Sequence, residues 1–174
     1  LACERICTRP SPRILIGGLG MGFTAAAALR VLGPSSEVIV AELVPGIVEW
    51  NRGPLAEPAG RPLDDPRVSV RVSDVADILR AEKGAYDAIL LDVDNGPAGL
   101  TRDSNNWLYA LVGLETAHLA LRPAGVLAVW SAYPSRPFAR RLRHAGFVVD
   151  EKPVRARGAR GGRQHIVWLA ERTC

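Results

Sequence analysis

Apolar positions along the chain form short runs that alternate with helix-like segments. The runs predict strands at 13–18, 37–43, 67–73, 86–92 and 126–131. The segments between them predict helices at 23–32, 45–51, 74–83 and 135–144. A further, long helix that ends at 121 is predicted after a Gly/Pro/Asn-rich loop at 93–105. The run 86–92 is apolar at almost every position, as expected of a parallel strand covered on both faces. This alternation is typical of an α/β fold with right-handed crossovers.

The last part of the chain departs from the alternation. Two strand-like runs, 147–155 and 164–170, are joined by a Gly/Arg-rich turn that leaves no room for a helix. We therefore expect them to form an antiparallel hairpin at the end of a mostly parallel sheet of seven strands. With 174 residues and neither linker nor internal repeat, the chain fits one domain, 1–174. Residues 1–11 contain a short helix with no initiator Met and are interpreted as the remnant of a longer chain.

A cluster of glycines follows the first predicted strand and precedes a helix. Gly17, Gly18, Gly20 and Gly22 stand in the sequence GGLGMG. Glycine lets the backbone approach a ligand closely, and the N-terminus of the following helix offers free N–H groups. This strand–turn–helix context favours a nucleotide-binding turn, and the alternative is a tight turn without a ligand.

Acidic residues end the second and third predicted strands. Glu42 lies 20 residues beyond the last of these glycines, at the end of the second predicted strand, and Leu43 follows it. A carboxylate at this place in a nucleotide-binding fold can accept hydrogen bonds from both ribose hydroxyls. Asp74, between Ser73 and Val75, is placed to accept a hydrogen bond from an adenine amino group while Val75 offers backbone and apolar contact. The alternative for Asp74 is an N-cap of the next helix. These residues extend the glycine turn into a candidate nucleoside site.

Three polar residues follow the fourth predicted strand, at the edge where open α/β sheets bind their ligands. They are Asp92, Asp94 and Asn95. Together they are suited to hold a cationic amine or to take its proton. Their negative charge also favours a positively charged sulfonium group nearby. Asn95 is part of an Asn-Gly-Pro turn as well, which leaves a purely structural role open for it.

Composition argues against several other classes of protein. No stretch of about 18 apolar residues is present, so no membrane span is expected. The net charge is −4 over residues 1–115 and +8 over 116–174, but 20 of the 22 basic residues are Arg, a bias that does not favour nucleic-acid binding. Cys3, Cys7 and Cys174 fit neither a disulfide framework nor a zinc site, so a cytoplasmic protein with reduced thiols and no metal is expected.

The chain resembles the spermidine synthase (polyamine aminopropyltransferase) family, a branch of the S-adenosylmethionine-dependent methyltransferase fold, in ILIGGLGMG, VIVAELVPGIVEW, DDPRVSVRVSDVADIL and YDAILLDVDNGP. The resemblance covers about residues 12–132 and implies a Rossmann-like sheet, to which the terminal hairpin also points. It implies S-adenosylmethionine or its decarboxylated form as co-substrate, aminopropyl transfer to a small-molecule amine, and a homodimer. By this likeness Glu42 binds ribose, Asp74 the adenine end and Asp92 the substrate amine.

The chain departs from the family pattern mainly in its acceptor half. Family members carry an Asp inside the glycine loop, where this chain has only Gly and hydrophobic residues. Where family members have a second Asp followed by Pro, this chain has Asn95 and Gly96, and where they have a Phe-Tyr pair in the next helix, it has Gly113 and Leu114. The small β-strand domain that precedes the first strand in the family has no counterpart in this sequence. Aminopropyl transfer is the leading prediction. The alternatives are methyl transfer to a small molecule, a non-catalytic nucleoside-binding module and, less favoured, a nicotinamide-dependent dehydrogenase.

Overall fold

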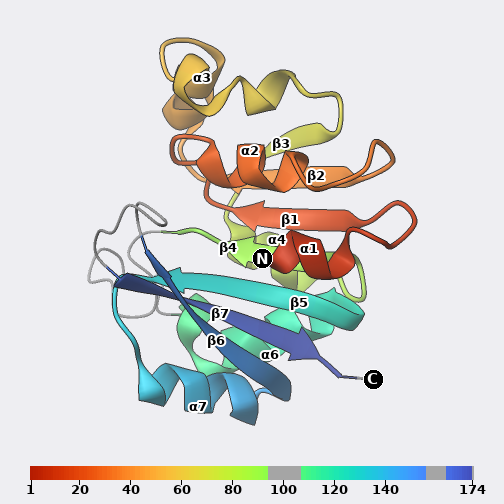
Figure 1. The fold of residues 1–174 in the computed structure, drawn as a ribbon, viewed down its shortest axis with the longest axis vertical. Helices are drawn as coiled ribbons and strands as arrows, with labels where there is room; N and C mark the ends of the chain where they lie inside the picture. Colours follow the sequence, from red (N-terminus) through yellow and green to blue (C-terminus); the bar gives the residue numbers. More distant parts are fainter. Residues whose placement is uncertain (94–106, 156–163, 174) are drawn as a thin grey trace.

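The centre of the chain is one sheet of seven strands (Figure 1). The structure, a computed structural model, describes residues 1–93, 107–155 and 164–173. The strands are β1 (Arg13–Gly17), β2 (Glu37–Glu42), β3 (Val68–Val72), β4 (Tyr86–Leu91), β5 (Leu121–Ser131), β6 (Phe147–Arg155) and β7 (Gln164–Arg172). Their order is β3-β2-β1-β4-β5-β7-β6, parallel as far as β5, with β7 antiparallel to both of its neighbours. The predicted sheet with its terminal hairpin is confirmed.

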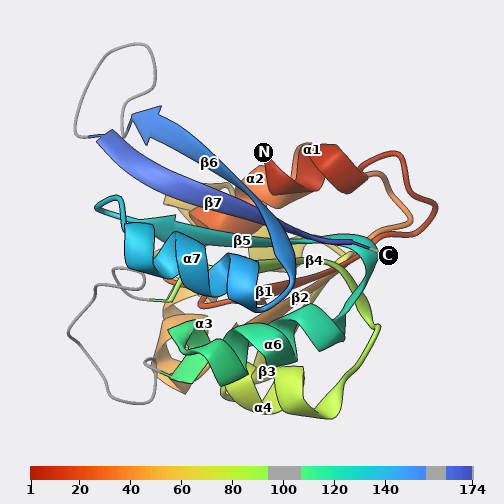
Figure 2. The same cartoon turned by 90° about the horizontal axis from the view of Figure 1, so that it is seen from below.

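Helices cover both faces of this sheet. They are α1 (Ala2–Ile6), α2 (Phe23–Leu29), α3 (Pro45–Arg52), α4 (Val75–Ala81), α6 (Leu111–Ala120) and α7 (Arg136–His144), with short 3-10 turns at Glu57–Ala59 and Pro62–Asp64 that were not predicted. Helices α1 and α2 lie on one face, and α4, α6 and α7 lie on the other (Figure 2). Within the described ranges, no helix has the length and apolar character needed to cross a membrane.

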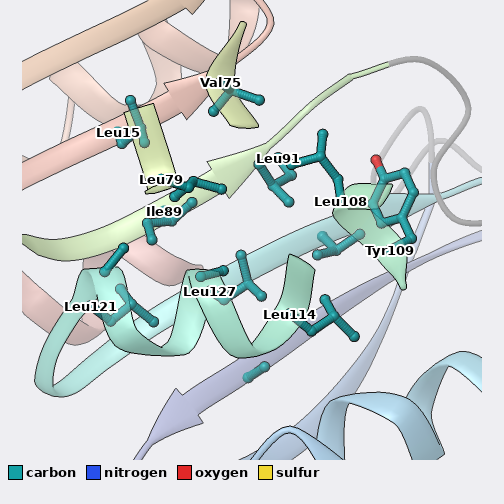
Figure 3. Close-up of a cluster of buried hydrophobic side chains, with 14 of the residues drawn as sticks. Leu15, Val75, Leu79, Ile89, Leu91, Leu108, Tyr109, Leu114, Leu121 and Leu127 are labelled. Carbon is teal, nitrogen blue, oxygen red and sulfur yellow. The ribbon is translucent and has the colours of Figure 1, made fainter. Parts of the chain in front are cut away.

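Alternate residues of the strands supply two hydrophobic cores, one on each face. On β1, Ile14 and Ile16 belong to the core that includes α1 and α2, whereas Leu15 belongs to the core that includes α4 and α6. Figure 3 shows this second core, where Leu79 of α4 and Leu114 of α6 meet the sheet. A fully buried Leu or Ile contributes roughly 1.5–3 kcal/mol relative to an exposed one. The two cores therefore hold the carboxyl ends of the strands in fixed positions.

Strand β5 begins at Leu121, earlier than the predicted strand at 126–131. Leu121 pairs with Tyr86, and the next pair is Val126 with Ala88, so residues 122–125 bulge out of the ladder. The sequence Arg-Pro-Ala-Gly predicts a turn because Pro and Gly favour turns. The structure accommodates this turn as a bulge within a strand, which is why the expected start was wrong.

A buried carboxylate, that of Asp87, joins several segments at the amino end of the sheet. Its Oδ1 accepts a hydrogen bond from Arg9 Nη1 at 2.6 Å. Its Oδ2 accepts from Arg122 Nη1 at 2.7 Å and from the backbone N–H of Arg13 at 2.8 Å. Arg9 also donates to two backbone carbonyls of the β5 bulge. The Asp87 side chain is only 3 % exposed, whereas those of Arg9 and Arg122 are 28 % and 41 % exposed, so its removal would take a buried charged acceptor from donors that water can partly solvate.

Replacing Asp87 with Ala is expected to lower the free energy of unfolding by about 2 kcal/mol, since it removes the buried charged acceptor of three hydrogen bonds while water still reaches both guanidinium groups. Urea denaturation followed by circular dichroism measures the loss. Asp64→Ala is the matched control because it removes an exposed carboxylate that pairs with Arg61, and it should cost less than about 0.5 kcal/mol. Equal losses in the two variants would contradict the role assigned to Asp87.

A second ionic cluster lies where α4 ends. Glu82 Oε2 accepts a hydrogen bond from Arg13 Nη1 at 2.7 Å, and its Oε1 accepts from Arg71 Nη1 at 2.5 Å. Partial burial opposes ionisation of the carboxyl group, but the hydrogen bonds from Arg71 and Arg13 outweigh it and lower the pKa of Glu82 to about 2. The two contacts tie the end of α4 to β1 and β3.

The stability that this cluster provides is expected to disappear in acid. The pKa of Glu82 in the folded protein lies below its ordinary value of 4.5, so its contribution is complete above that value and is lost as the pH falls toward 2. Glu82→Gln should therefore be about 2 kcal/mol less stable than the wild type at pH 7, and the gap should narrow toward pH 3. Chemical denaturation of both proteins across this range tests the expectation, and a constant gap would refute it.

Candidate functional site

The carboxyl ends of the parallel strands form one edge of the sheet, and the glycine turn 17–22 follows β1 at this edge (Figure 1). Gly18 has a φ of +90°, and a Cβ atom there would lie 2.5 Å from the backbone oxygen of Asp92, so only glycine fits. The Gly18 N–H donates to the Ala41 carbonyl at 2.8 Å, and the Asp92 N–H donates to the Gly17 carbonyl at 2.9 Å. The turn is thereby held between β2 and β4.

Glu42 lies beneath this turn at the end of β2. Its carboxylate is buried, with Oε2 accepting from the Leu19 N–H and Oε1 from the Val44 N–H, each at 2.9 Å. It therefore joins the glycine turn to the start of α3. Each carboxylate oxygen keeps a further lone pair, so these contacts are compatible with the ribose role, which stays a prediction. Leu43 is exposed beside it.

Asn51 of α3 supports the same turn and was not predicted. Its Nδ2 donates to the Gly20 carbonyl at 2.8 Å and to the Ile47 carbonyl at 2.9 Å. The residue is buried, and a Cβ atom on Gly22 would lie 3.0 Å from Asn51 Oδ1. Gly20 and Gly22 both have positive φ. In the sequence, Asn51 is only a polar residue one helical turn after Ile47. Because solvent-exposed helix positions show the same pattern, the sequence did not indicate its contact with the glycine turn.

Asp74 is the N-cap of α4, which is the structural role that the sequence left open for it beside adenine binding. Its Oδ1 accepts from the Ala76 N–H at 2.8 Å. Among the described residues, none donates to Oδ2, so capping does not exclude a ligand contact. The Ser73 N–H donates to the Glu42 carbonyl at 3.0 Å, which keeps the ends of β3 and β2 together. The side chain of Val75 is buried against Gly17, where it packs in the core rather than facing an open site.

Asp92 directly follows β4, and its side chain is exposed. Its Oδ2 accepts a hydrogen bond of 2.5 Å from the hydroxyl of Thr24, which stands in the first turn of α2. Thr24 was not singled out in the sequence. Asp94 and Asn95 lie outside the described residues. Within those residues, no three His, Cys, Asp or Glu side chains are grouped so as to hold a metal ion. The structure thus brings Glu42, Asp74 and Asp92 to one edge, around the glycine turn.

A pocket of about 560 Å³ opens beside Asp92, on the face of the sheet that carries α1 and α2. Asp92 and Thr24 line it at the ligand edge, Phe23, Val31 and Trp130 contribute to its walls, and the first four residues of the sequence, 1–4, form a further wall. Small-molecule sites in proteins have volumes of roughly 300–1,000 Å³. The sequence did not indicate this pocket, because its lining comes from separate helices and strands.

Comparison with known proteins agrees with the resemblance found in the sequence. No family model matches the chain. The chain is 36 % identical over 121 residues to putrescine N-methyltransferase 1 of Nicotiana tabacum, and this alignment covers 68 % of the chain and 30 % of that protein. It is 32 % identical over 146 residues to the polyamine aminopropyltransferase of Mycobacterium tuberculosis, covering 78 % of this chain and 27 % of that protein. The chain therefore spans less than a third of the length of these relatives.

Solved structures show the same fold. The spermidine synthase of Thermotoga maritima matches with a TM-score of 0.78 and 19 % identity over 98 % of this chain and 57 % of that one. Human methyltransferase-like protein 13, solved in complex with SAH, matches with a TM-score of 0.67 and 19 % identity over 96 % of this chain and 78 % of that one. The predicted Rossmann-like methyltransferase fold is confirmed. Over about two thirds of its length or more the chain is thus similar in sequence to putrescine N-methyltransferases and polyamine aminopropyltransferases, and it has the fold of the spermidine synthases.

Proposed function

We propose that the chain binds a sulfonium nucleoside, S-adenosylmethionine or its decarboxylated form, and transfers a group from it to an amine. One observation carries this proposal. The glycine turn lies so close to the backbone oxygen of Asp92 that Gly18 has no space for a side chain, with the carboxylate of Glu42 directly beneath. Such a turn offers backbone to a nucleoside at the edge where open α/β sheets bind ligands.

The described residues divide into two groups by role. Gly17, Gly18, Gly20 and Gly22 allow close approach of the nucleoside, Glu42 accepts from the ribose hydroxyls and Asp74 accepts from the adenine amino group, with Leu43, Ser73 and the backbone of Val75 beside them. Asp92 faces the reacting centre. Its exposed carboxylate attracts the ammonium form of the acceptor and the positive sulfonium alike. Asp94 and Asn95, which the sequence groups with Asp92, lie outside the described residues, and their role in holding the amine is proposed from the sequence alone.

The chemistry needs little beyond positioning, because the sulfonium is already an activated leaving group. The amine gives up a proton to Asp92 or to water. Its lone pair then attacks a carbon bound to the sulfur, and the carbon–sulfur bond breaks with its electron pair remaining on sulfur as a neutral thioether. The nitrogen, which is positively charged once the new carbon–nitrogen bond has formed, then releases a second proton to water.

Two transferred groups fit this scheme. Aminopropyl transfer from the decarboxylated nucleoside is supported by the 32 % identity to a polyamine aminopropyltransferase, over 78 % of this chain. Methyl transfer from S-adenosylmethionine is supported by the 36 % identity to a putrescine N-methyltransferase. We favour aminopropyl transfer because that alignment extends over more of the chain. In both cases an amine is the acceptor.

Calorimetric titration separates these alternatives. Decarboxylated S-adenosylmethionine is expected to bind at least about ten-fold more tightly than the intact form, a difference of about 1.4 kcal/mol. NAD is the negative control. Tighter binding of the intact form would move the proposal to methyl transfer, and binding of NAD alone would refute a sulfonium nucleoside site.

An enzyme and a binding module are distinguished with Asp92→Asn. If the chain is an enzyme, this variant loses most of its turnover with amines but still binds the nucleoside, somewhat more weakly because the sulfonium loses a negatively charged neighbour. A wild-type protein that binds the nucleoside but transfers nothing to any amine would support the module.

Gly18→Ala tests the location of the nucleoside. The added methyl group would meet the backbone oxygen of Asp92 at 2.5 Å and force a positive φ on Ala, so nucleoside affinity should fall more than ten-fold, about 1.4 kcal/mol. Gly33→Ala is the matched control, because a Cβ atom there meets nothing within 4 Å. Unchanged affinity in a folded Gly18→Ala protein would place the nucleoside elsewhere.

A further inference from the structure

We propose that Thr24 is a positioning residue whose hydroxyl holds the carboxylate of Asp92 in the orientation that receives the amine. This inference rests on the proposed function, in which Asp92 faces the reacting centre. Thr24 stands in the first turn of α2 and lies 68 residues from Asp92 in the sequence. The fold therefore creates this pairing, and local chain geometry does not.

The backbone of Asp92 is fixed by the glycine turn. Its N–H donates to the Gly17 carbonyl at 2.9 Å. Its own carbonyl oxygen lies 2.5 Å from the place that a Cβ atom on Gly18 would take. The side-chain torsions of Asp92 then decide where the carboxylate points. Because this side chain is exposed, packing does not fix these torsions, and a hydrogen bond has to do so.

The Thr24 hydroxyl supplies this hydrogen bond. Its Oγ1 donates to Asp92 Oδ2 at 2.5 Å. Hydroxyl groups that donate to an ionised carboxylate typically do so at about 2.5–2.7 Å, and such bonds are roughly twice as strong as bonds between neutral groups. Within the part of the chain that the structure describes, no residue donates to Oδ1 of Asp92. This second oxygen is therefore open to an N–H group of the amine.

A second helical threonine shows the contact that Thr24 does not make. In α6, Thr116 Oγ1 donates at 2.7 Å to the backbone carbonyl four residues earlier, which is a common local bond for threonine in a helix. For Thr24 the carbonyl four residues earlier is that of Gly20, and this carbonyl accepts from Asn51 Nδ2. The Thr24 hydroxyl bonds instead to Asp92, across the ligand edge of the sheet.

This arrangement has a consequence for the reaction. With Oδ2 held by Thr24, Oδ1 takes the proton of the bound ammonium at a fixed place, so the lone pair that is set free faces the carbon bound to sulfur. That lone pair forms the carbon–nitrogen bond while the carbon–sulfur electron pair stays on sulfur. Without the hydroxyl, the negative charge of Asp92 remains but the carboxylate is free to turn. Misplacing a reacting group by about 1 Å can slow a reaction about 100-fold.

Thr24→Val tests this role, because it removes the hydroxyl and keeps the size of the side chain. The acceptor is putrescine, the amine named in one of the relatives, with whichever sulfonium nucleoside the protein binds. We expect kcat to fall at least about ten-fold, which corresponds to about 1.4 kcal/mol. KM for the amine and Kd for the nucleoside should stay within about two-fold, because the charge of Asp92 remains.

Two matched variants accompany this measurement. Thr24→Ser keeps the hydroxyl and should restore most of the lost kcat. Thr116→Val removes a hydroxyl from another half-buried helical threonine, far from the site in sequence, and should alter neither kcat nor Kd. Thr24→Val should also have no further effect on kcat in an Asp92→Ala protein, because no carboxylate is left there to be positioned.

The contact itself is measured without turnover. The carboxyl carbon resonance of Asp92 in a carbon-13 NMR spectrum is assigned by its loss in Asp92→Asn. It should move in Thr24→Val, because a hydrogen bond to a carboxylate changes the shielding of its carbon, and it should stay in place in Thr116→Val.

Several results would overturn the inference. They are an unmoved Asp92 resonance or an unchanged kcat in a folded Thr24→Val protein, and a loss of kcat that persists in the Asp92→Ala protein. A nucleoside Kd that weakens in parallel with kcat would overturn it too, because Thr24 would then support the glycine turn. A wild type that binds no sulfonium nucleoside, or transfers nothing to any amine, would refute the proposed function instead. The NMR measurement would still report the contact, so the two failures are distinguishable.

Discussion

The backbone oxygen of Asp92 lies where a side chain on Gly18 would have to go, and this close approach joins β1 to β4 at the ligand edge. Other features of the site follow from it. The chain leaves β1 in a turn in which Gly18, Gly20 and Gly22 have positive φ, and Thr24 in the first turn of α2 donates a hydrogen bond to the Asp92 carboxylate. Any ligand that lies along the turn therefore also lies beside the acidic end of β4.

The turn is shaped before any ligand arrives. Glu42 accepts the Leu19 N–H from beneath, and Asn51 donates to the Gly20 carbonyl from α3. These two side chains are buried, so their contacts are little weakened by water. A site held in this way loses little conformational entropy on binding, which is the physical benefit of preorganisation.

The fold could be predicted because each strand carries its own periodic signal, and the hairpin could be predicted because no helix fits between its strands. The glycines, Glu42, Asp74 and Asp92 could be predicted for a related reason, since strand ends place them on a common edge whatever the details of packing. Asn51 and Thr24 could not. Their significance lies in partners distant in sequence, Gly20 and Asp92, which only packing brings close. The same holds for the pocket, assembled from α1, α2 and three strands.

The position of β7 has a consequence for synthesis. It follows the other six strands in sequence, yet it lies between β5 and β6 rather than at the edge. A nascent chain that has emerged only as far as β6 therefore presents β5 with an open edge, and Phe138 of α7 lacks Trp168, the ring that packs against it at 4.8 Å. Strand edges of this kind invite pairing with other chains. The protein is thus most exposed to aggregation on the ribosome, in the interval before the hairpin closes its sheet.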